Sequence, residues 1–190
     1  LQLDKSGNMW IATDHGITIC DTKTDISSPA SFVTLGVARG FPSDAITSFG
    51  LANKGTEMWV GTGDKGVIVL QLPDGFVNRN APTLLTSLHE YRSDQGLGSD
   101  FVETICEDSK GNIWFTSSSG VYEYDPGKNE YFHHLTKEHP GVPLVTETRF
   151  IAEDRIGHYW ICTINNGLYE LYFENKKEVV RNYNKNSGNG

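Results

Sequence analysis

The sequence predicts an all-β fold, a β-propeller built from about four blades, each of them a four-stranded antiparallel sheet. The first observation is that the four tryptophans recur at intervals of 49, 55 and 46 residues, which is the period range of propeller blades. The second is that the same order of turns and strands surrounds each tryptophan. A single sheet of this size cannot bury both of its faces alone, so adjacent sheets must stack, and stacking in a ring gives a propeller.

A hairpin turn precedes each tryptophan. An Asp or Asn stands six residues before it, and a glycine stands three or four residues before it: Asp4 and Gly7, Asn53 and Gly55, Asp108 and Gly111, Asp154 and Gly157. Asp and Asn side chains bond backbone groups two residues on, and glycine supplies the positive φ of a tight turn. One strand therefore ends at this turn and another begins.

The remaining strands follow in order. The segments that start at the tryptophan are β-branched, aromatic or small, as a strand requires; they are WIAT, WVGT, WFTS and WICT. A second turn closes on a glycine, after which third strands begin at ITIC, VIVL, VYEY and LYEL. First strands are predicted at AITSFGLA, FVETICED and TRFIAED, and fourth strands at SFVTLG, TLLTSLHEY, YFHHL and VVRNYN. We interpret the tryptophan as a packing residue between blades rather than a ligand contact.

The chain is predicted to be a single propeller segment over 1–190. Its blades are expected at about 1–40 with a truncated first strand, at about 41–95, at about 96–140 and at about 141–190. Lead-in segments open the last three blades at GFPSDAI, GLGSDFV and GVPLVTE. We expect the segment to be cut from a larger propeller, for example a seven-bladed one, or to be an arc that self-association completes. QLPDGFVNRNAPTL and KEHPGVP are predicted to be surface excursions.

The charge balance and the cysteines exclude some classes of function. The formal net charge is −8, and without a cluster of Lys and Arg this argues against nucleic-acid binding. The sequence holds no apolar run of transmembrane length and no signal peptide, but it starts without Met, so a leader could have been removed. Cys20, Cys106 and Cys162 form no metal spacing; they are expected to be isolated buried thiols, with a disulfide between neighbouring blades as the alternative.

The stretch GLGSDFVETICEDSKGNIWFTSSSGVYEYD resembles the two-component regulator propeller repeat, found in the periplasmic sensor regions of Bacteroides-type hybrid two-component histidine kinases. The resemblance covers nearly the whole chain in four copies. Two copies depart from it: blade four has Leu144 and Val145 where the lead-in Ser and Asp stand elsewhere, and blade two has Asn53 for Asp.

The resemblance implies a periplasmic, ligand-sensing ectodomain that responds to carbohydrate or to polysaccharide breakdown products. No segment resembles a phospho-acceptor histidine region or an ATP lid, so any kinase activity would belong to a parent polypeptide. The expected partners are an oligosaccharide, other blades of the same propeller or a second copy. Nucleic acid is not expected as a partner, and a membrane only through the parent protein.

No catalytic or cofactor motif is present, and neither an enzymatic activity nor a cofactor is predicted. His133 and His134 are adjacent on a predicted strand and point to opposite faces, so they cannot jointly bind one metal. One alternative is a protein-binding scaffold. Another is a metal-dependent lyase of the streptogramin-inactivating type, with His15 acting beside Glu147 or Asp44.

A binding site is predicted where loops converge on one face of the propeller. The loops between second and third strands and the lead-in segments meet there. The candidate ligand-binding residues are Asp14, His15, Asp44, Asp64, Lys65, Asp100, Arg149, Asn165 and Asn166. Amides and carboxylates suit a hydroxyl-rich sugar, and the two cations could hold an acidic group. The competing interpretation is that these loops are polar only because they are solvated.

Overall fold

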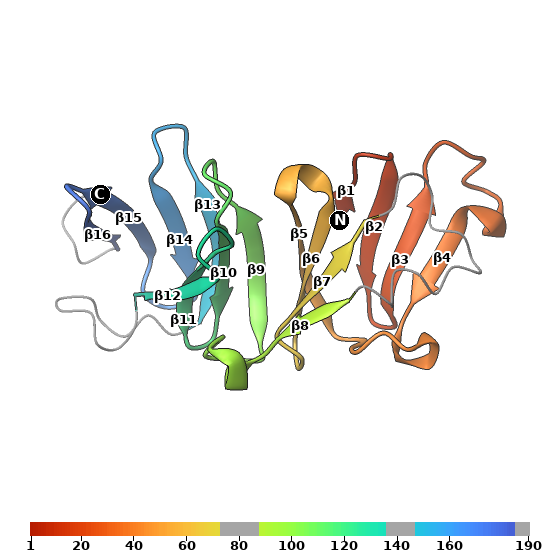
Figure 1. Cartoon of the computed structure of the whole chain (residues 1–190), viewed down its shortest axis with the longest axis horizontal. Coiled ribbons are helices and arrows are strands. Elements are labelled where there is room, and N and C mark those ends of the chain that lie inside the picture. Colours follow the sequence, from red (N-terminus) through yellow and green to blue (C-terminus); the bar gives the residue numbers. More distant parts are fainter. Residues whose placement is uncertain (73–87, 136–146, 185–190) are drawn as a thin grey trace. The chain divides into compact units, whose positions relative to one another are not determined.

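The structure is a computed structural model that describes residues 1–72, 88–135 and 147–184. Its strands form four separate four-stranded antiparallel sheets, and each sheet is a meander whose strands pair in chain order (Figure 1). We number them sheet 1 (β1–β4), sheet 2 (β5–β8), sheet 3 (β9–β12) and sheet 4 (β13–β16). The all-β prediction of four four-stranded blades is confirmed.

The bounds of the strands follow the predicted segments. Sheet 1 holds β1 Gln2–Leu3, β2 Asn8–Thr13, β3 Gly16–Asp21 and β4 Phe32–Leu35, and sheet 2 holds β5 Ile46–Ala52, β6 Glu57–Thr62, β7 Val67–Gln71 and β8 His89–Tyr91. Sheet 3 holds β9 Val102–Glu107, β10 Ile113–Ser117, β11 Gly120–Asp125 and β12 Glu130–His134. Sheet 4 holds β13 Thr148–Glu153, β14 Tyr159–Thr163, β15 Leu168–Glu174 and β16 Lys177–Tyr183. Short 3-10 turns lie at η1 Pro29–Ser31, η2 Val37–Arg39, η3 Asn53–Gly55 and η4 Ser93–Gln95.

The chain divides into two compact units, Leu1–Val102 and Glu103–Gly190. Sheets 1 and 2 belong to the first unit, and sheets 3 and 4 belong to the second apart from the first residue of β9. The predicted excursion after β7 falls mostly on 73–87, and the one before blade four falls on 136–146. Both therefore lie outside the described residues, as do Leu144 and Val145.

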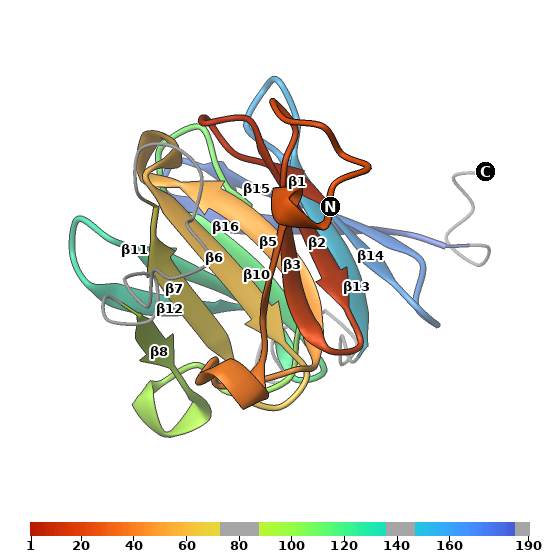
Figure 2. The ribbon, with the colours of Figure 1, turned by 90° about the vertical axis from the view of Figure 1, so that its right-hand side faces the viewer.

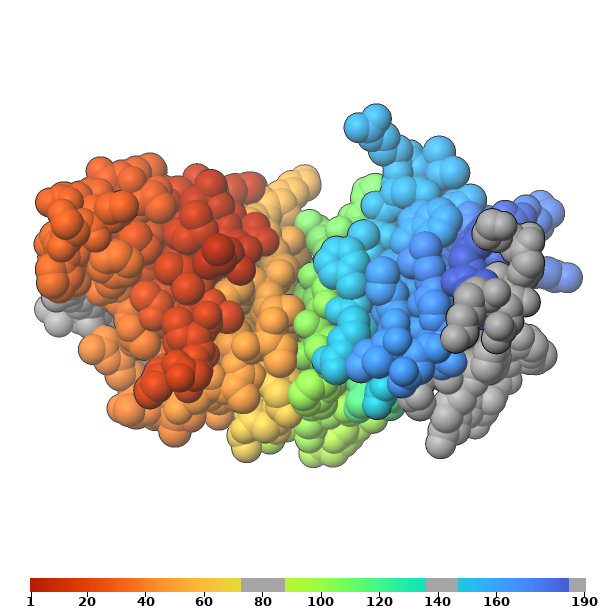
Figure 3. Space-filling model, turned by 180° about the vertical axis from the view of Figure 1, so that it is seen from behind, coloured from red at the N-terminus to blue at the C-terminus, as the bar shows by residue number. Residues whose placement is uncertain are grey.

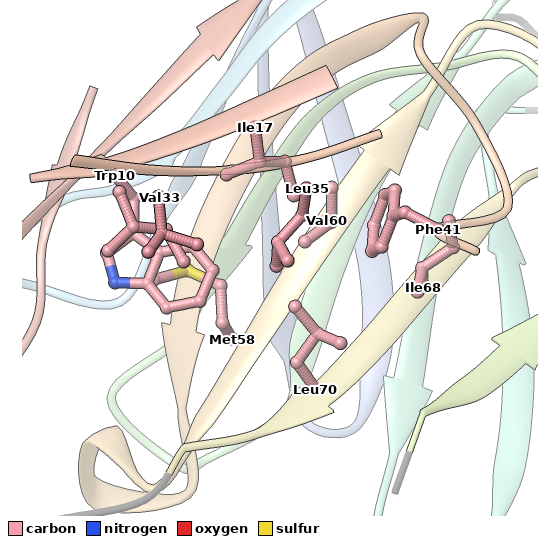
Figure 4. Close-up of a cluster of buried hydrophobic side chains, with 10 residues drawn as sticks. Trp10, Ile17, Val33, Leu35, Phe41, Met58, Val60, Ile68 and Leu70 are labelled. Atoms are coloured by element: carbon pink, nitrogen blue, oxygen red, sulfur yellow. The ribbon is translucent and has the colours of Figure 1, made fainter. Parts of the chain in front are cut away.

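The core of the first unit lies between sheets 1 and 2, which stand side by side in Figure 2. Figure 4 shows these side chains pointing toward one another: Trp10, Ile17, Val33, Leu35, Phe41, Met58, Val60, Ile68 and Leu70, with Ile19 completing the cluster. Trp10 is fully buried and meets the Phe49 ring edge-on at 6.5 Å between centroids. The prediction that the tryptophan packs between blades is confirmed here.

The core of the second unit repeats this arrangement between sheets 3 and 4. It contains Trp114, Val121, Leu135, Ile151, Tyr159, Ile161, Tyr169 and Leu171. Trp114 is fully buried and stacks on Tyr159 with 4.0 Å between ring centroids. Trp160, at the same position of sheet 4, is only partly buried.

The β13–β14 turn projects from the surface of this unit in Figure 3, and its residue Ile156 is 76% exposed.

The aspartate of the first turn has a second role, which was not predicted from the sequence. Asp108 Oδ1 accepts the backbone amides of Lys110 (2.9 Å) and Asn112 (2.8 Å), as the predicted turn chemistry requires. Asp108 Oδ2 accepts the indole N–H of Trp114 at 3.0 Å and the hydroxyl of Tyr159 at 2.7 Å. The side chain thus ties the turn to the buried tryptophan six residues on and to the neighbouring sheet.

The same bond recurs in the first and fourth blades. Asp4 Oδ2 accepts the Trp10 indole at 2.9 Å, and Asp154 Oδ2 accepts the Trp160 indole at 2.8 Å. A buried indole N–H that lacks an acceptor costs about 1–3 kcal/mol, so the aspartate makes burial of the tryptophan possible.

Blade two satisfies its tryptophan differently, because Asn53 replaces the aspartate. Glu57 Oε2 accepts the Trp59 indole N–H at 3.0 Å, and Glu57 Oε1 accepts a hydrogen bond from Asn53 Nδ2 at 3.2 Å. Asn53, Lys54 and Gly55 all have positive φ, which accommodates the extra residue of this turn. The departure from the repeat is therefore compensated by the first residue of β6.

In sheets 1 and 4, the glycine that closes the second turn is required by close approach of the fourth strand. A Cβ at Gly16 would lie 2.2 Å from the Leu35 carbonyl oxygen, and one at Gly167 would lie 2.4 Å from the Tyr183 carbonyl oxygen. Both glycines also have positive φ. Any other residue would clash with the fourth strand and strain the backbone.

The three cysteines are free thiols. Cys20 is buried, as expected, and Cys106 is partly buried, with desolvation raising the pKa of its thiol to about 12. The expectation of burial is wrong for Cys162, which is exposed. Its position on β14 faces away from the core, because Ile161 fills the inward position beside it.

We predict that Asp108→Ala lowers the free energy of unfolding by about 3 kcal/mol, because it leaves the Trp114 indole and the Tyr159 hydroxyl without their shared acceptor. Urea denaturation followed by tryptophan fluorescence measures this. Asp154→Ala is the matched control: it removes the same indole bond from the partly buried Trp160 and should cost less. An equal or smaller loss for Asp108→Ala would contradict the anchoring role.

Candidate functional site

An open pocket of about 550 Å³ lies in the first unit, between the end of β2 and the start of β5. Its lining residues are Ala12, Thr13, Asp14, Asp44, Ala45 and Ile46. Three of these are apolar and two are carboxylates, so the pocket combines an apolar wall with an acidic rim. Asp14 and Asp44 were predicted as ligand-binding residues. The apolar wall was missed, because it comes from strand ends that the sequence marks only as strand.

Asp14 and His15 form an exposed pair at the rim of this pocket. His15 Nδ1 lies 2.6 Å from Asp14 Oδ1, and both side chains are more than four-fifths exposed. The hydrogen bond with Asp14 is the main reason that the pKa of His15 is raised, and the charge of Asp44 adds to this. The same bond lowers the pKa of Asp14. Protonated His15 places a positive charge beside the Asp14 carboxylate.

The lead-in aspartates have a structural role. Asp44 Oδ1 accepts the backbone amide of Val37 at 2.8 Å, and Asp100 Oδ1 accepts that of Ser93 at 2.7 Å. Each therefore reaches back seven residues to the first residue of the preceding 3-10 turn, η2 or η4. Two of the nine candidates thus hold the chain in place whether or not they also contact a ligand.

The lead-in serines also accept backbone amides, in each case from two residues ahead. Ser43 Oγ accepts the Ala45 amide at 3.0 Å and donates to Asp64 Oδ1 at 2.5 Å. Ser99 Oγ accepts the Phe101 amide at 3.1 Å. Asp64 is thereby bound to the lead-in segment of its own blade.

The loops of the first unit are linked from one blade to the next. Gly36 is confined between the two pocket loops, because a Cβ there would lie 2.7 Å from both Asp44 Oδ1 and the His15 carbonyl oxygen. Gly66, which follows Lys65, donates its amide to the Asp100 carbonyl at 2.8 Å. Within the described chain, the Lys65 ammonium makes no ion pair. The six candidates of this unit therefore lie in connected loops.

The other three candidates belong to the second unit. Arg149 forms an ion pair with Glu103, and Asn165 Nδ2 donates to Glu147 Oε2 at 3.2 Å. The Asn166 amide donates to Thr163 Oγ1 at 3.0 Å. An acidic ligand at Arg149 would have to compete with Glu103. That all nine residues surround a single channel stays a prediction.

Two negative findings apply only to the described residues. Among them, no group of three or more His, Cys, Asp or Glu side chains could hold a metal ion. No helix within 1–72, 88–135 and 147–184 is long and apolar enough to cross a membrane. His133 is exposed and His134 is buried, which confirms that they point to opposite faces of β12.

We predict that Asp44→Ala and Asp100→Ala each lower the free energy of unfolding by about 1 kcal/mol, because each frees a capped backbone amide. Asp14→Ala should change it by less than about 0.5 kcal/mol, since its ion pair is solvated. Urea denaturation of the three variants tests the assignment. A neutral Asp44→Ala, or an Asp14→Ala as costly as the others, would contradict it.

Comparison with known proteins places this geometry among propellers. Residues 96–119 match the family model of the two component regulator propeller. The fold is similar to the extracellular domain of a proposed hybrid two component system from B. thetaiotaomicron (TM-score 0.72, 21% identity, covering 95% of this chain and 22% of that one). A comparison with curated proteins finds no match.

Two further structures share the fold. One is the extracellular domain of a proposed one component system from B. thetaiotaomicron (TM-score 0.68, 17% identity, covering 96% of this chain and 24% of that one). The other is a streptogramin B lyase (TM-score 0.62, 14% identity, covering 96% of this chain and 53% of that one). The chain thus spans less than a quarter of either extracellular domain. Residues 96–119 are thus similar to a two component regulator propeller repeat, within a fold of repeated propeller blades.

Proposed function

We propose that this chain is part of an extracytoplasmic, ligand-sensing propeller of a two-component signal transduction system, and that it has no catalytic activity of its own. The observation that carries the proposal is the match of 96–119 to the two component regulator propeller, within a fold shared with extracellular domains of such systems. Any kinase would lie elsewhere in a parent polypeptide. A scaffold function remains the alternative, and the fold shared with the lyase leaves lyase activity as a second one.

The ligand that fits the proposal is a carbohydrate or a product of polysaccharide breakdown. The carboxylates of Asp14 and Asp44 can accept sugar hydroxyls at the pocket rim. Ala12, Ala45 and Ile46 offer the apolar surface against which the C–H face of a sugar ring packs. Lys65 supplies a positive charge in the next loop for an acidic sugar.

We expect oligosaccharide binding to be weakened about tenfold by Asp14→Asn, because a hydrogen bond to a charged acceptor contributes about 1.5 kcal/mol or more. Lys65→Ala should weaken only the binding of acidic sugars. Isothermal titration calorimetry of the whole chain with neutral and acidic oligosaccharides measures both effects. Asp25→Asn, in the exposed β3–β4 connection, is the control and should leave affinity unchanged.

Two results would contradict these proposals. Unchanged affinity in both Asp14→Asn and Lys65→Ala would remove the pocket as the site. Turnover of a streptogramin that depends on an added divalent metal would replace the sensing function with the lyase alternative.

We further propose that the uncovered sheet faces pack against other blades, of the same polypeptide or of a second copy. Trp114 is fully buried between sheets 3 and 4, whereas Trp160, at the equivalent position of sheet 4, is partly exposed. Phe150, which pairs with Cys162 across β13 and β14, is 53% exposed. Apolar surface of this kind favours association.

Light scattering of the whole chain should therefore show species larger than a monomer as concentration rises, and Trp160→Ala should reduce them because it removes apolar contact area. A monomer mass at every concentration, with little binding of an apolar dye, would contradict the association.

A further inference from the structure

The second unit contains a buried histidine held between two carboxylates. His134 Nε2 lies 3.0 Å from Glu123 Oε2, and its Nδ1 lies 2.7 Å from Glu178 Oε2. The side chains are 6%, 14% and 15% exposed, respectively. Glu123 belongs to β11 beside the histidine in sheet 3, whereas Glu178 belongs to β16 of sheet 4. The imidazole therefore bridges the two sheets near their fourth strands.

The other elements packed around the histidine contribute aromatic rings. Trp114 of β10 stacks on the imidazole with 4.7 Å between centroids, and Phe173 of β15 meets it edge-on at 6.1 Å. Tyr159 of β14 also stacks on Trp114, and its hydroxyl donates to Asp108 Oδ2. Among the described residues, the charged groups facing the histidine are therefore Glu123 and Glu178, both acidic.

While both glutamates are ionised, this geometry requires a doubly protonated ring. A neutral imidazole carries one N–H and one lone pair, so it can donate to only one of the two carboxylates. The second carboxylate would then face a lone pair in a buried site, where an unmatched charge is costly. Only the imidazolium donates to both. Burial alone would lower the pKa of His134, but the hydrogen bonds with Glu123 and Glu178 outweigh it, and the pKa is raised.

We propose that Glu123, His134 and Glu178 form a protonation-dependent latch that joins the fourth strands β12 and β16 of the two sheets. The latch is closed while the histidine is an imidazolium and loosens when the ring loses a proton. Deprotonation removes one of the two hydrogen bonds. It also removes the cation that separates two buried carboxylates.

The direction of the effect follows from proton linkage. The closed state binds the proton more tightly than the open state, whose histidine has an ordinary pKa of about 6.5. The latch contributes its full stabilisation below that value and loses it as pH rises through the higher closed-state pKa. Between the open-state and closed-state pKa values, the equilibrium constant for opening of the latch should rise by up to about tenfold per pH unit.

Two other histidines serve for comparison. Within the described residues, the ring of His158 contacts a single carboxylate, with its Nδ1 2.8 Å from Glu170 Oε1, so a neutral tautomer satisfies that bond. His133 is next to His134 in sequence but exposed on the opposite face. His133→Gln is therefore a matched control that changes the same residue type on the same strand.

Hydrogen exchange of the whole chain between about pH 6 and pH 9, corrected for the intrinsic exchange rate, tests the latch. Protection of the β12 and β16 amides should fall with rising pH in the unaltered protein and in His133→Gln. It should be independent of pH in His134→Gln. In Glu178→Gln the pH dependence should be reduced, because a neutral ring can donate to Glu123 and accept from the new amide. This second variant keeps the test decisive if His134→Gln does not fold.

Titration of the His134 ring by NMR gives an independent readout, which should place its midpoint above that of an exposed histidine. The proposal is overturned by a midpoint at or below the ordinary value, by protection that does not vary with pH in the unaltered protein, or by a His133→Gln variant that also abolishes the dependence.

Discussion

The hydrogen bond between a carboxylate at or just after the first turn and the tryptophan indole is the interaction that every blade shares. It joins the first hairpin turn to the strand that follows, so the tryptophan can enter the apolar core without an unsatisfied N–H. Asp108 makes one bond more than its counterparts, because its Oδ2 accepts the Tyr159 hydroxyl of the next sheet as well as the indole. Glu57 shows that the requirement is for a carboxylate near the indole rather than for aspartate at one position.

Residues that recur between blades and residues that differ between blades have different roles in this chain. The residues that recur, such as Asp44 and Asp100, form the same backbone bonds in successive blades. The position before the closing glycine instead holds His15, Lys65, Ser119 and Asn166 in turn. A residue free to vary between blades is not needed by the blade itself. The non-repeated loop residues around the unit-1 pocket are therefore the better candidates for ligand selection.

The proposed latch also arises from a variation on a repeated arrangement. Glu123 pairs in register with Trp114 on β10, as Glu170 pairs with Trp160 on β14. In sheet 4 the glutamate accepts a Tyr183 hydroxyl at 2.7 Å, which stays protonated over the ordinary pH range. In sheet 3 the equivalent place on the fourth strand holds His134, which also meets Glu178. A histidine at the position that holds a tyrosine in sheet 4 thus introduces a titratable bridge between the two sheets.

The sequence alone determined the number of sheets, the order of their strands and the turns between them, because turn chemistry and strand alternation act over a few residues and recur with the period. Tertiary structure decided the partners of the polar side chains. Nothing local indicates that Glu57 would replace an aspartate, that Asp44 would cap an amide seven residues back, or that Glu178 would approach His134 from 44 residues away. Cys162 is exposed for the same reason: whether a sheet face is covered depends on what packs against it, and the strand pattern does not encode that.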